Sequence, residues 1–152
     1  MIALTLTLFA AESSTAKPAC KEGVHAFGSA KARTFCGPAQ ATVMVDGQSF
    51  TLRGGACDTG RGYLTINLGT IVIGKTSRTK PDYFGITVGD VAGGEPAAQD
   101  GTFTDGVVSY VRKNRSASVS QASVTLKGKR TRGTFSGTLV GSGKPVSGSL
   151  RC

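Results

Sequence analysis

The stretch ATVMVDGQSFTLRGGAC, residues 41–57, decides the fold because it encodes a complete β-hairpin. Asp46-Gly47 separates two runs in which apolar and polar residues alternate. A two-residue type I′ turn requires positive φ at both central positions, which glycine adopts freely and aspartate adopts more readily than most residues. The turn sets the register, which pairs Val45 with Gln48, Val43 with Phe50 and Ala41 with Leu52.

The two faces of this hairpin differ in polarity, because successive side chains of a strand point to opposite sides. The apolar face carries Ala41, Val43, Val45, Phe50 and Leu52. The other face carries Thr42, Ser49, Thr51 and Arg53, with Met44 as the exception. The hairpin therefore covers a core with one face and meets water with the other. Gly54-Gly55 then ends the pattern as a bulge or bend would.

The rest of the chain predicts an all-β domain. The sequence has 152 residues, 22 glycines and no tryptophan, and its apolar runs are short and rich in β-branched residues. Further strands are expected at 63–68, 70–73, 83–88, 107–111, 118–126, 134–139 and 146–152. No convincing helix follows any strand, which argues against parallel βαβ units. We predict an antiparallel β-sandwich of about eight or nine short strands.

Two segments are expected to lie outside the strands. Residues 17–38 form a polar lead-in bounded by Cys20 and Cys36, in which VHAFGSAKARTF favours at most a short helical turn. Residues 91–105 contain glycines, a proline and three acidic residues, and are expected to be the longest irregular segment. Residues 17–152 are thus predicted to form one domain, preceded by residues 1–16.

The four cysteines, Cys20, Cys36, Cys57 and Cys152, form no CxxC pair, which favours disulfides and an oxidising compartment. The hairpin register, extended outward, places Cys36 opposite Cys57, although Pro38 and Gly54-Gly55 should end the ladder first. A Cys57–Cys152 bond would pin the terminal strand and close a loop of about 95 residues, worth roughly 4–5 kcal/mol. We therefore predict Cys57–Cys152 and Cys20–Cys36, with Cys36–Cys57 as the alternative.

The N-terminus indicates export. Residues 2–11 are an apolar run of the length found in signal peptides, and Ser14-Thr15-Ala16 fits a cleavage site, although a basic segment is missing. We interpret residues 1–16 as a signal-peptide remnant, with a first strand at LTLTLF as the alternative. Lys17 stands where a lipoprotein signal places a leucine-like residue before its cysteine, so lipid anchoring at Cys20 is not expected. The expected location is extracytoplasmic, secreted or at the cell surface.

The formal net charge of +9 is concentrated in three predicted turns. The candidate polyanion contacts are Arg112, Lys113 and Arg115 in one turn and Lys127, Lys129, Arg130 and Arg132 in another. Lys75, Arg78 and Lys80 occupy a third loop. Residues 116–126 are long enough for one strand, which would place the first two clusters at opposite ends; a turn at Gln121 would bring them together. Because no aromatic residues interleave the cations, stacked single-stranded nucleic acid is not suggested.

No motif supports catalysis or a cofactor. Residues 69–76 match the P-loop pattern G-x-x-x-x-G-K-[ST], but Thr-Ile-Val-Ile favours an extended strand and Pro81 prevents the following helix. His25 is the one histidine, and only Glu22 lies near it in sequence. We therefore expect no nucleotide, metal or other cofactor, no specific nucleic acid, and a monomer. The alternative is a secreted enzyme whose site is assembled from loops.

From Val43 onward the chain resembles the mycobacterial 19 kDa lipoprotein antigen family of actinobacterial envelopes. The shared features are V-x-V-D-G at residues 43–47, a cysteine ten residues later (Cys57) and a C-terminal cysteine (Cys152). The resemblance implies a surface-exposed, disulfide-bonded, non-enzymatic protein of antigen or adhesin type. We expect such a protein here, binding an anionic envelope polymer or lipid surface through its basic loops.

Overall fold

The hairpin at the centre of the sequence forms in the predicted register. In the computed structural model, which describes residues 19–74 and 78–152, it consists of β3 (Gln40–Val45) and β4 (Gln48–Arg53). Asp46 and Gly47 have φ of 52° and 75°, as a type I′ turn requires. The local sequence therefore sets this part of the fold unaided.

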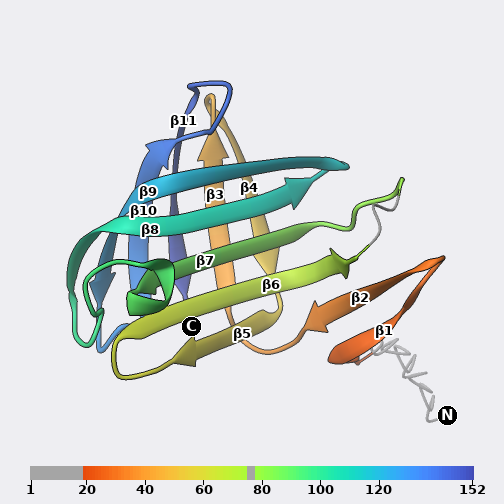
Figure 1. Ribbon diagram of the computed structural model, residues 1–152, viewed down its shortest axis with the longest axis horizontal. Helices are drawn as coiled ribbons and strands as arrows, with labels where there is room; N and C mark the ends of the chain where they lie inside the picture. The colour runs from red at the N-terminus through yellow and green to blue at the C-terminus, as the bar shows by residue number, and fades with distance from the viewer. Residues whose placement is uncertain (1–18, 75–77) are drawn as a thin grey trace, which may run out of the picture.

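The protein is all-β, with eleven described strands in one antiparallel sheet (Figure 1). Their order is β1-β2-β6-β7-β8-β9-β10-β11-β3-β4, and β5 pairs with β6 off this path. The remaining strands are β1 (Gly23–Phe27), β2 (Ala30–Phe35), β5 (Gly55–Thr59), β6 (Tyr63–Ile73), β7 (Tyr83–Gly89), β8 (Gly101–Arg112), β9 (Arg115–Lys127), β10 (Arg132–Thr138) and β11 (Pro145–Arg151). One 3-10 turn, η1 (Asp90–Ala92), follows β7. Among the described residues, no helix has the length and apolar character needed to cross a membrane.

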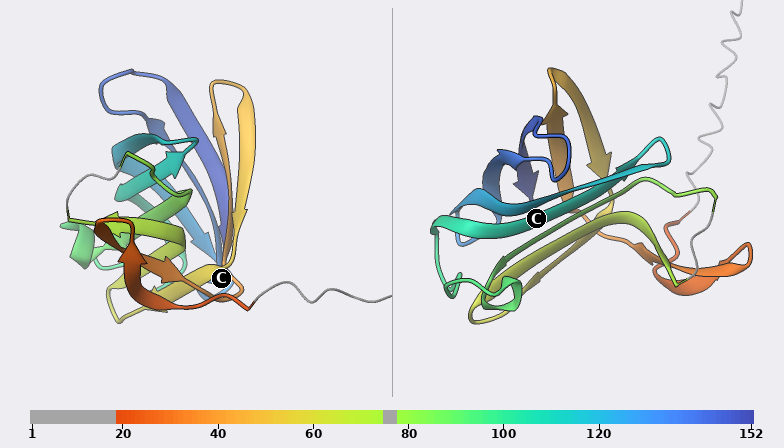
Figure 2. Two further views of the ribbon diagram at one scale, coloured as in Figure 1. Left: turned by 90° about the vertical axis from the view of Figure 1, so that its right-hand side faces the viewer. Right: turned by 45° about the horizontal axis from the view of Figure 1, so that its top comes forward.

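The sheet folds over on itself into two layers whose strands cross steeply (Figures 1 and 2). The long strands β8 and β9 run through both layers, and their pairing shifts on either side of Gly106. Gln121 has a φ of 63°, and a Cβ at Gly106 would lie 2.6 Å from the Val124 side chain. Bulges at these positions bend the β8–β9 ribbon. The two layers are consistent with the predicted sandwich, but one continuous sheet makes both.

The core fills the space between the two layers. Phe84 from β7 and Phe135 from β10 face each other there, with ring centroids 5.6 Å apart. The other large side chains that are fully buried are Leu64, Ile66, Leu68, Ile86, Leu126, Val43, Val88, Val108, Val119 and Val124. Both layers contribute to this set, so neither has a complete core of its own.

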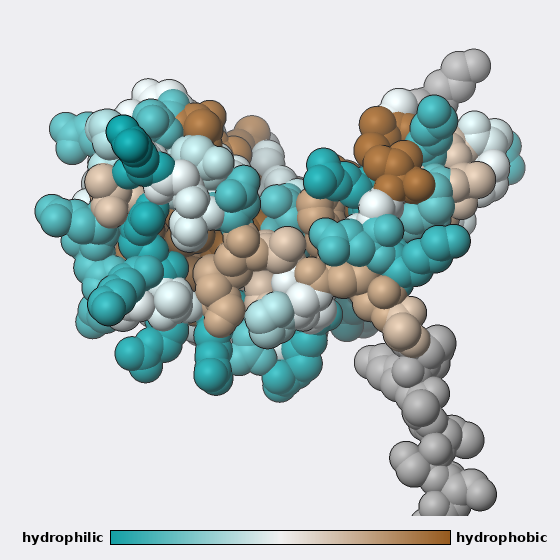
Figure 3. Space-filling view, turned by 90° about the horizontal axis from the view of Figure 1, so that it is seen from below, coloured by the Kyte–Doolittle hydropathy of each residue, from teal (hydrophilic) through white to brown (hydrophobic). Residues whose placement is uncertain are grey.

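The structure predicted for the lead-in, residues 17–38, is wrong. Between Cys20 and Cys36 the chain forms the β1–β2 hairpin rather than a polar loop or a helical turn. β2 pairs with the C-terminal half of β6, and β5 pairs with the N-terminal half of the same edge. This pairing buries Ala32 and Phe35, which outweighs a weak helical preference. The hairpin and the end of β6 form a lobe that stands apart from the main body (Figure 3).

The expected strand number of eight or nine is also too low. Three strands were not expected, namely β1, β2 and β5, whereas the expected strands at 63–68 and 70–73 are one strand, β6. Gly69 has a φ of 78° and allows β6 to continue through a local irregularity. Part of the segment expected to be irregular, residues 101–105, belongs to β8. The long-range pairing of β8 with β9 accounts for this difference.

Both predicted disulfides are present. Cys20 bonds to Cys36 and Cys57 to Cys152, with Cα atoms 5.9 and 5.7 Å apart. Cys57 belongs to β5 and Cys152 follows β11, so the second bond ties one layer to the other. The interpreted signal-peptide remnant, residues 1–16, lies outside the described residues.

Candidate functional site

The two predicted cationic clusters lie at opposite ends of β9. The β8–β9 turn is at the right of Figure 1 and the β9–β10 turn is on the opposite side. Gln121 lies within β9 as a bulge, so it does not form the turn that would bring the clusters together. The geometry expected for a single strand is therefore confirmed, and the seven cations do not form one patch.

At the β9–β10 turn, Arg130 has a structural role. Its guanidinium donates hydrogen bonds to the carbonyl oxygens of Gly60, Tyr63 and Ala97, at 2.9, 3.0 and 3.0 Å. The Asp100 carboxylate accepts the backbone N–H groups of Arg130 and Lys129 at 2.7 and 3.1 Å. The hydrogen bond from the Arg130 backbone is the main cause of a lowered pKa of Asp100. Arg130 thus holds the β5–β6 turn and the connection before β8 in place rather than binding a ligand.

Replacing Arg130 with methionine is expected to lower the free energy of unfolding by about 2–3 kcal/mol, because three carbonyl groups lose a charged donor. Urea unfolding followed by circular dichroism measures the loss. Lys129→Met is the matched control, since the exposed Lys129 side chain belongs to the same turn and forms no hydrogen bond with the residues that the structure describes. Equal losses in the two variants would contradict the role assigned to Arg130.

At the β8–β9 turn, Asn114 brings two basic loops together. Its side-chain oxygen accepts the Lys80 backbone N–H at 2.7 Å, and its amide nitrogen donates to the Arg78 carbonyl at 2.8 Å. The Lys80 ammonium also donates to the Ser116 hydroxyl at 3.1 Å. The third basic loop therefore joins the first cluster, although Lys75 lies outside the described residues.

We call this surface the basic end; it consists of Arg78, Lys80, Arg112, Lys113 and Arg115. The acid near it is Asp82, which forms an ion pair with Arg112 and accepts the Lys113 backbone N–H at 3.1 Å. Four cations of the basic end thus remain without a carboxylate partner among the described residues. At physiological salt, exposed charges interact mainly when they lie within about 8 Å of one another.

The basic end opens onto a groove of about 640 Å³ between the β3–β4 turn and the β8–β9 hairpin. Phe50 and Tyr110 line it, with ring centroids 5.6 Å apart, and the Arg112 guanidinium lies 5.5 Å from the centre of the Phe50 ring. Burial raises the pKa of Tyr110. Lys144 lines the same groove and is paired with Asp46. The groove combines aromatic surface with cations, which sequence reasoning missed because Phe50 and Tyr110 belong to different layers.

The other predicted cluster contributes to a second basic surface on the outer face of the β4-β3-β11-β10-β9 layer. Strand pairing aligns Arg53 with Gln40, Gln40 with Arg151, Arg151 with Arg132, and Arg132 with Lys127. We call Arg53, Arg151, Arg132 and Lys127 the cation row. All four residues are exposed. Only Arg132 and Lys127 were predicted as polyanion contacts, because Arg53 and Arg151 are isolated in the sequence.

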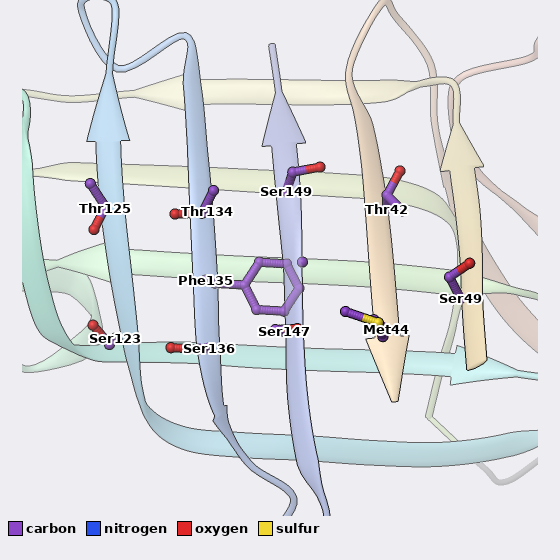
Figure 4. A pocket seen from close by; sticks show the side chains of 11 residues that line it. Thr42, Met44, Ser49, Ser123, Thr125, Thr134, Phe135, Ser136, Ser147 and Ser149 are labelled. Carbon is purple, nitrogen blue, oxygen red and sulfur yellow. The ribbon is translucent and has the colours of Figure 1, made fainter. Parts of the chain in front are cut away.

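Beside the cation row lies a row of hydroxyl groups that spans six strands, which we call the hydroxyl row. In register from β4 to β8, it consists of Thr51, Thr42, Ser149, Thr134, Thr125 and Thr102. A further row follows with Ser49, Met44, Ser147, Ser136 and Ser123. Apart from Thr51 and Thr102, the side chains of these two rows line an open depression of about 490 Å³ (Figure 4).

The candidate catalytic and nucleotide motifs do not assemble into sites. His25 lies on β1, where a ring nitrogen is 3.3 Å from the Gly23 carbonyl oxygen, and no acid lines the depression beside it. Residues 69–73 of the P-loop match belong to β6, while Lys75 and Thr76 lie outside the described residues. Within residues 19–74 and 78–152, no three His, Cys, Asp or Glu side chains are grouped to hold a metal ion.

The chain matches no protein-family model, and comparisons with curated proteins and with solved structures find no match. The resemblance to the 19 kDa lipoprotein antigen family therefore stays an expectation. Function has to be inferred from the two basic surfaces.

Proposed function

We propose that this is an exported, non-catalytic protein of the cell envelope or the secreted fraction that binds an anionic envelope polymer at its basic end. The observation that carries the proposal is that Asn114 joins the loop of Arg78 and Lys80 to the turn of Arg112, Lys113 and Arg115, where Asp82 pairs with only one of the five cations. Two disulfides support an extracytoplasmic location, because such bonds persist in oxidising compartments. The antigen or adhesin class is part of the same proposal and follows from the sequence resemblance.

A polymer fits the basic end better than a flat lipid surface does. Lys113 and Arg115 line a groove, so a flexible anionic chain can lie in it and contact both of them. A bilayer would touch only the protruding turn. Arg112 stays occupied by Asp82, and the polymer would meet Arg78, Lys113 and Arg115, whose side chains are exposed.

Replacing Arg78, Lys113 and Arg115 with glutamine is expected to lower the salt concentration at which the protein elutes from a dextran sulfate column. Each cation that no longer contacts the polymer means that about one counterion fewer is released on binding, so the affinity depends less steeply on salt concentration. The control replaces Lys21, Arg61 and Lys129, which are also exposed, so that both variants lose the same charge. Equal shifts in the two variants would show that net charge alone causes retention. Tighter binding to phosphatidylglycerol vesicles than to the polymer would favour a lipid surface instead.

A further inference from the structure

We propose that the outer face of the β4-β3-β11-β10-β9 layer is a second binding site, which takes a linear acidic polysaccharide running across the strands. The site combines the cation row with the hydroxyl row and with the depression that the hydroxyl side chains line; Figure 4 shows the depression. It deepens the proposed function by naming a chemical class of polymer. It uses none of the residues of the basic end, so the two sites are tested separately.

The spacing of the cation row suits a polymer with regularly repeated charges. Neighbouring strands lie about 4.7–4.9 Å apart, so the row from Arg53 to Lys127 extends over roughly 19 Å. This step is close to the length that one pyranose residue adds to an extended glycan. A carboxylated sugar on each strand would therefore meet Arg151, Arg132 and Lys127 in turn. Arginine binds carboxylate groups with two parallel hydrogen bonds, which also fixes their orientation.

The cation row lowers the stability of the fold when no ligand is bound. Arg132 lies directly opposite Arg151 on one side and opposite Lys127 on the other. Like charges in directly opposed positions of a sheet destabilise it, and natural sheets usually place opposite charges there. The two ion pairs of the described residues involve Asp82 and Asp46, and neither acid belongs to this face. A bound polyanion would relieve the repulsion. Ligand binding therefore explains the arrangement, whereas stability does not.

The hydroxyl row identifies the polymer as a carbohydrate. Serine and threonine hydroxyls donate and accept hydrogen bonds, as sugar hydroxyls do. The pairs Thr42–Thr51 and Thr102–Thr125 are already hydrogen bonded, at 3.0 and 2.9 Å, which orders the two ends of the row. Between them, the depression offers a place for a chain of sugar rings along the hydroxyl row.

The same face disfavours nucleic acid. Single-stranded nucleic acid is held by bases stacked on exposed aromatic side chains. The aromatic residue that lines the depression is Phe135, and its side chain is buried in the core. A ligand on this face is therefore held by charge and by hydroxyl groups.

The test is isothermal titration calorimetry at physiological salt, with oligogalacturonate long enough to cross the five strands and with polyglutamate of equal charge. The native protein is expected to bind oligogalacturonate about tenfold tighter than polyglutamate, because only the sugar meets the hydroxyl groups. A cation-row variant, with Lys127, Arg132 and Arg151 changed to glutamine, is expected to lose about tenfold or more in affinity for both. A hydroxyl variant, with Thr125→Val, Thr134→Val and Ser149→Ala, is expected to lose only the preference for the sugar.

A second measurement separates a binding role from a structural one. Without ligand, the cation-row variant is expected to unfold at the same or a higher temperature than the native protein, since opposed like charges have been removed. A lower unfolding temperature would assign the row to stability and overturn the proposal.

Three binding results would also overturn it. They are unchanged oligogalacturonate affinity in the cation-row variant, equal affinity of the native protein for the two polymers, and tighter binding of an oligonucleotide than of the sugar. The variant that lacks Arg78, Lys113 and Arg115 is expected to keep its oligogalacturonate affinity at the outer face. If it loses that affinity while the cation-row variant keeps it, the basic end holds the sugar and only the second site is refuted.

Discussion

Unfolding a variant in which Cys57 and Cys152 are both serine is expected to require about 4.7 kcal/mol less free energy than unfolding the native protein at 25 °C. The bond joins residues 95 positions apart, so in the chain-entropy model it strongly restricts the unfolded chain. It also ties β5 in one layer to the end of β11 in the other. Without this bond, β11 keeps its pairing with β10 and β3, but its C-terminal end is no longer covalently anchored.

Urea unfolding of the double variant measures this loss, with the Cys20→Ser, Cys36→Ser variant as the control. The Cys20–Cys36 bond spans 16 positions, for which the same model gives about 3 kcal/mol. It encloses only the β1–β2 hairpin, which lies at the edge of the sheet. A control that loses as much stability as the Cys57–Cys152 variant would contradict the view that the second bond holds the two layers together.

The β3–β4 hairpin could be predicted in full because its signal is local. The Asp46-Gly47 turn fixes six residue pairs, and alternation along the strands assigns the faces. The β1–β2 hairpin could not be predicted in this way. Its residues alternate poorly, and β2 is held by pairing with residues 69–73 of β6, about forty positions along the chain. β5 was missed for a different reason: its pairing with β6 is local, but its residues, GACDT, show no apolar alternation and are typical of a loop.

The candidate sites show the same limit. Sequence reasoning found the cations of the turns, because they are close together in the chain. It placed Arg53 on a polar strand face, but the partners of Arg53 in the cation row depend on the order β4-β3-β11-β10-β9. Alternation could have marked the last outward residue of each strand as a candidate. Strand order, which follows from long-range pairing, was the missing information.

Changing Phe135 to alanine is expected to lower the free energy of unfolding by about 3–5 kcal/mol. Phe135 is 3% exposed, and its ring packs against Phe84 of the other layer with centroids 5.6 Å apart. It also covers Gly148, its direct partner on β11, where a Cβ would lie 2.5 Å from the Phe135 ring. Because Gly148 has no side chain, it cannot fill the cavity that the substitution leaves, which favours the upper part of this range.

The matched control is Phe50→Ala, since Phe50 is only partly buried at the edge of the groove and its loss opens no enclosed cavity. Chemical unfolding of Phe135→Ala, Phe84→Ala and the double variant forms a mutant cycle, with an expected coupling of about 0.5–1.5 kcal/mol for the ring pair. Additive losses would mean that the two rings do not stabilise each other across the layers. A loss in Phe50→Ala as large as that in Phe135→Ala would place the main packing contact at the groove rather than beneath the outer face. That face would then lack the rigid support which the cation row and the hydroxyl row need to keep their register.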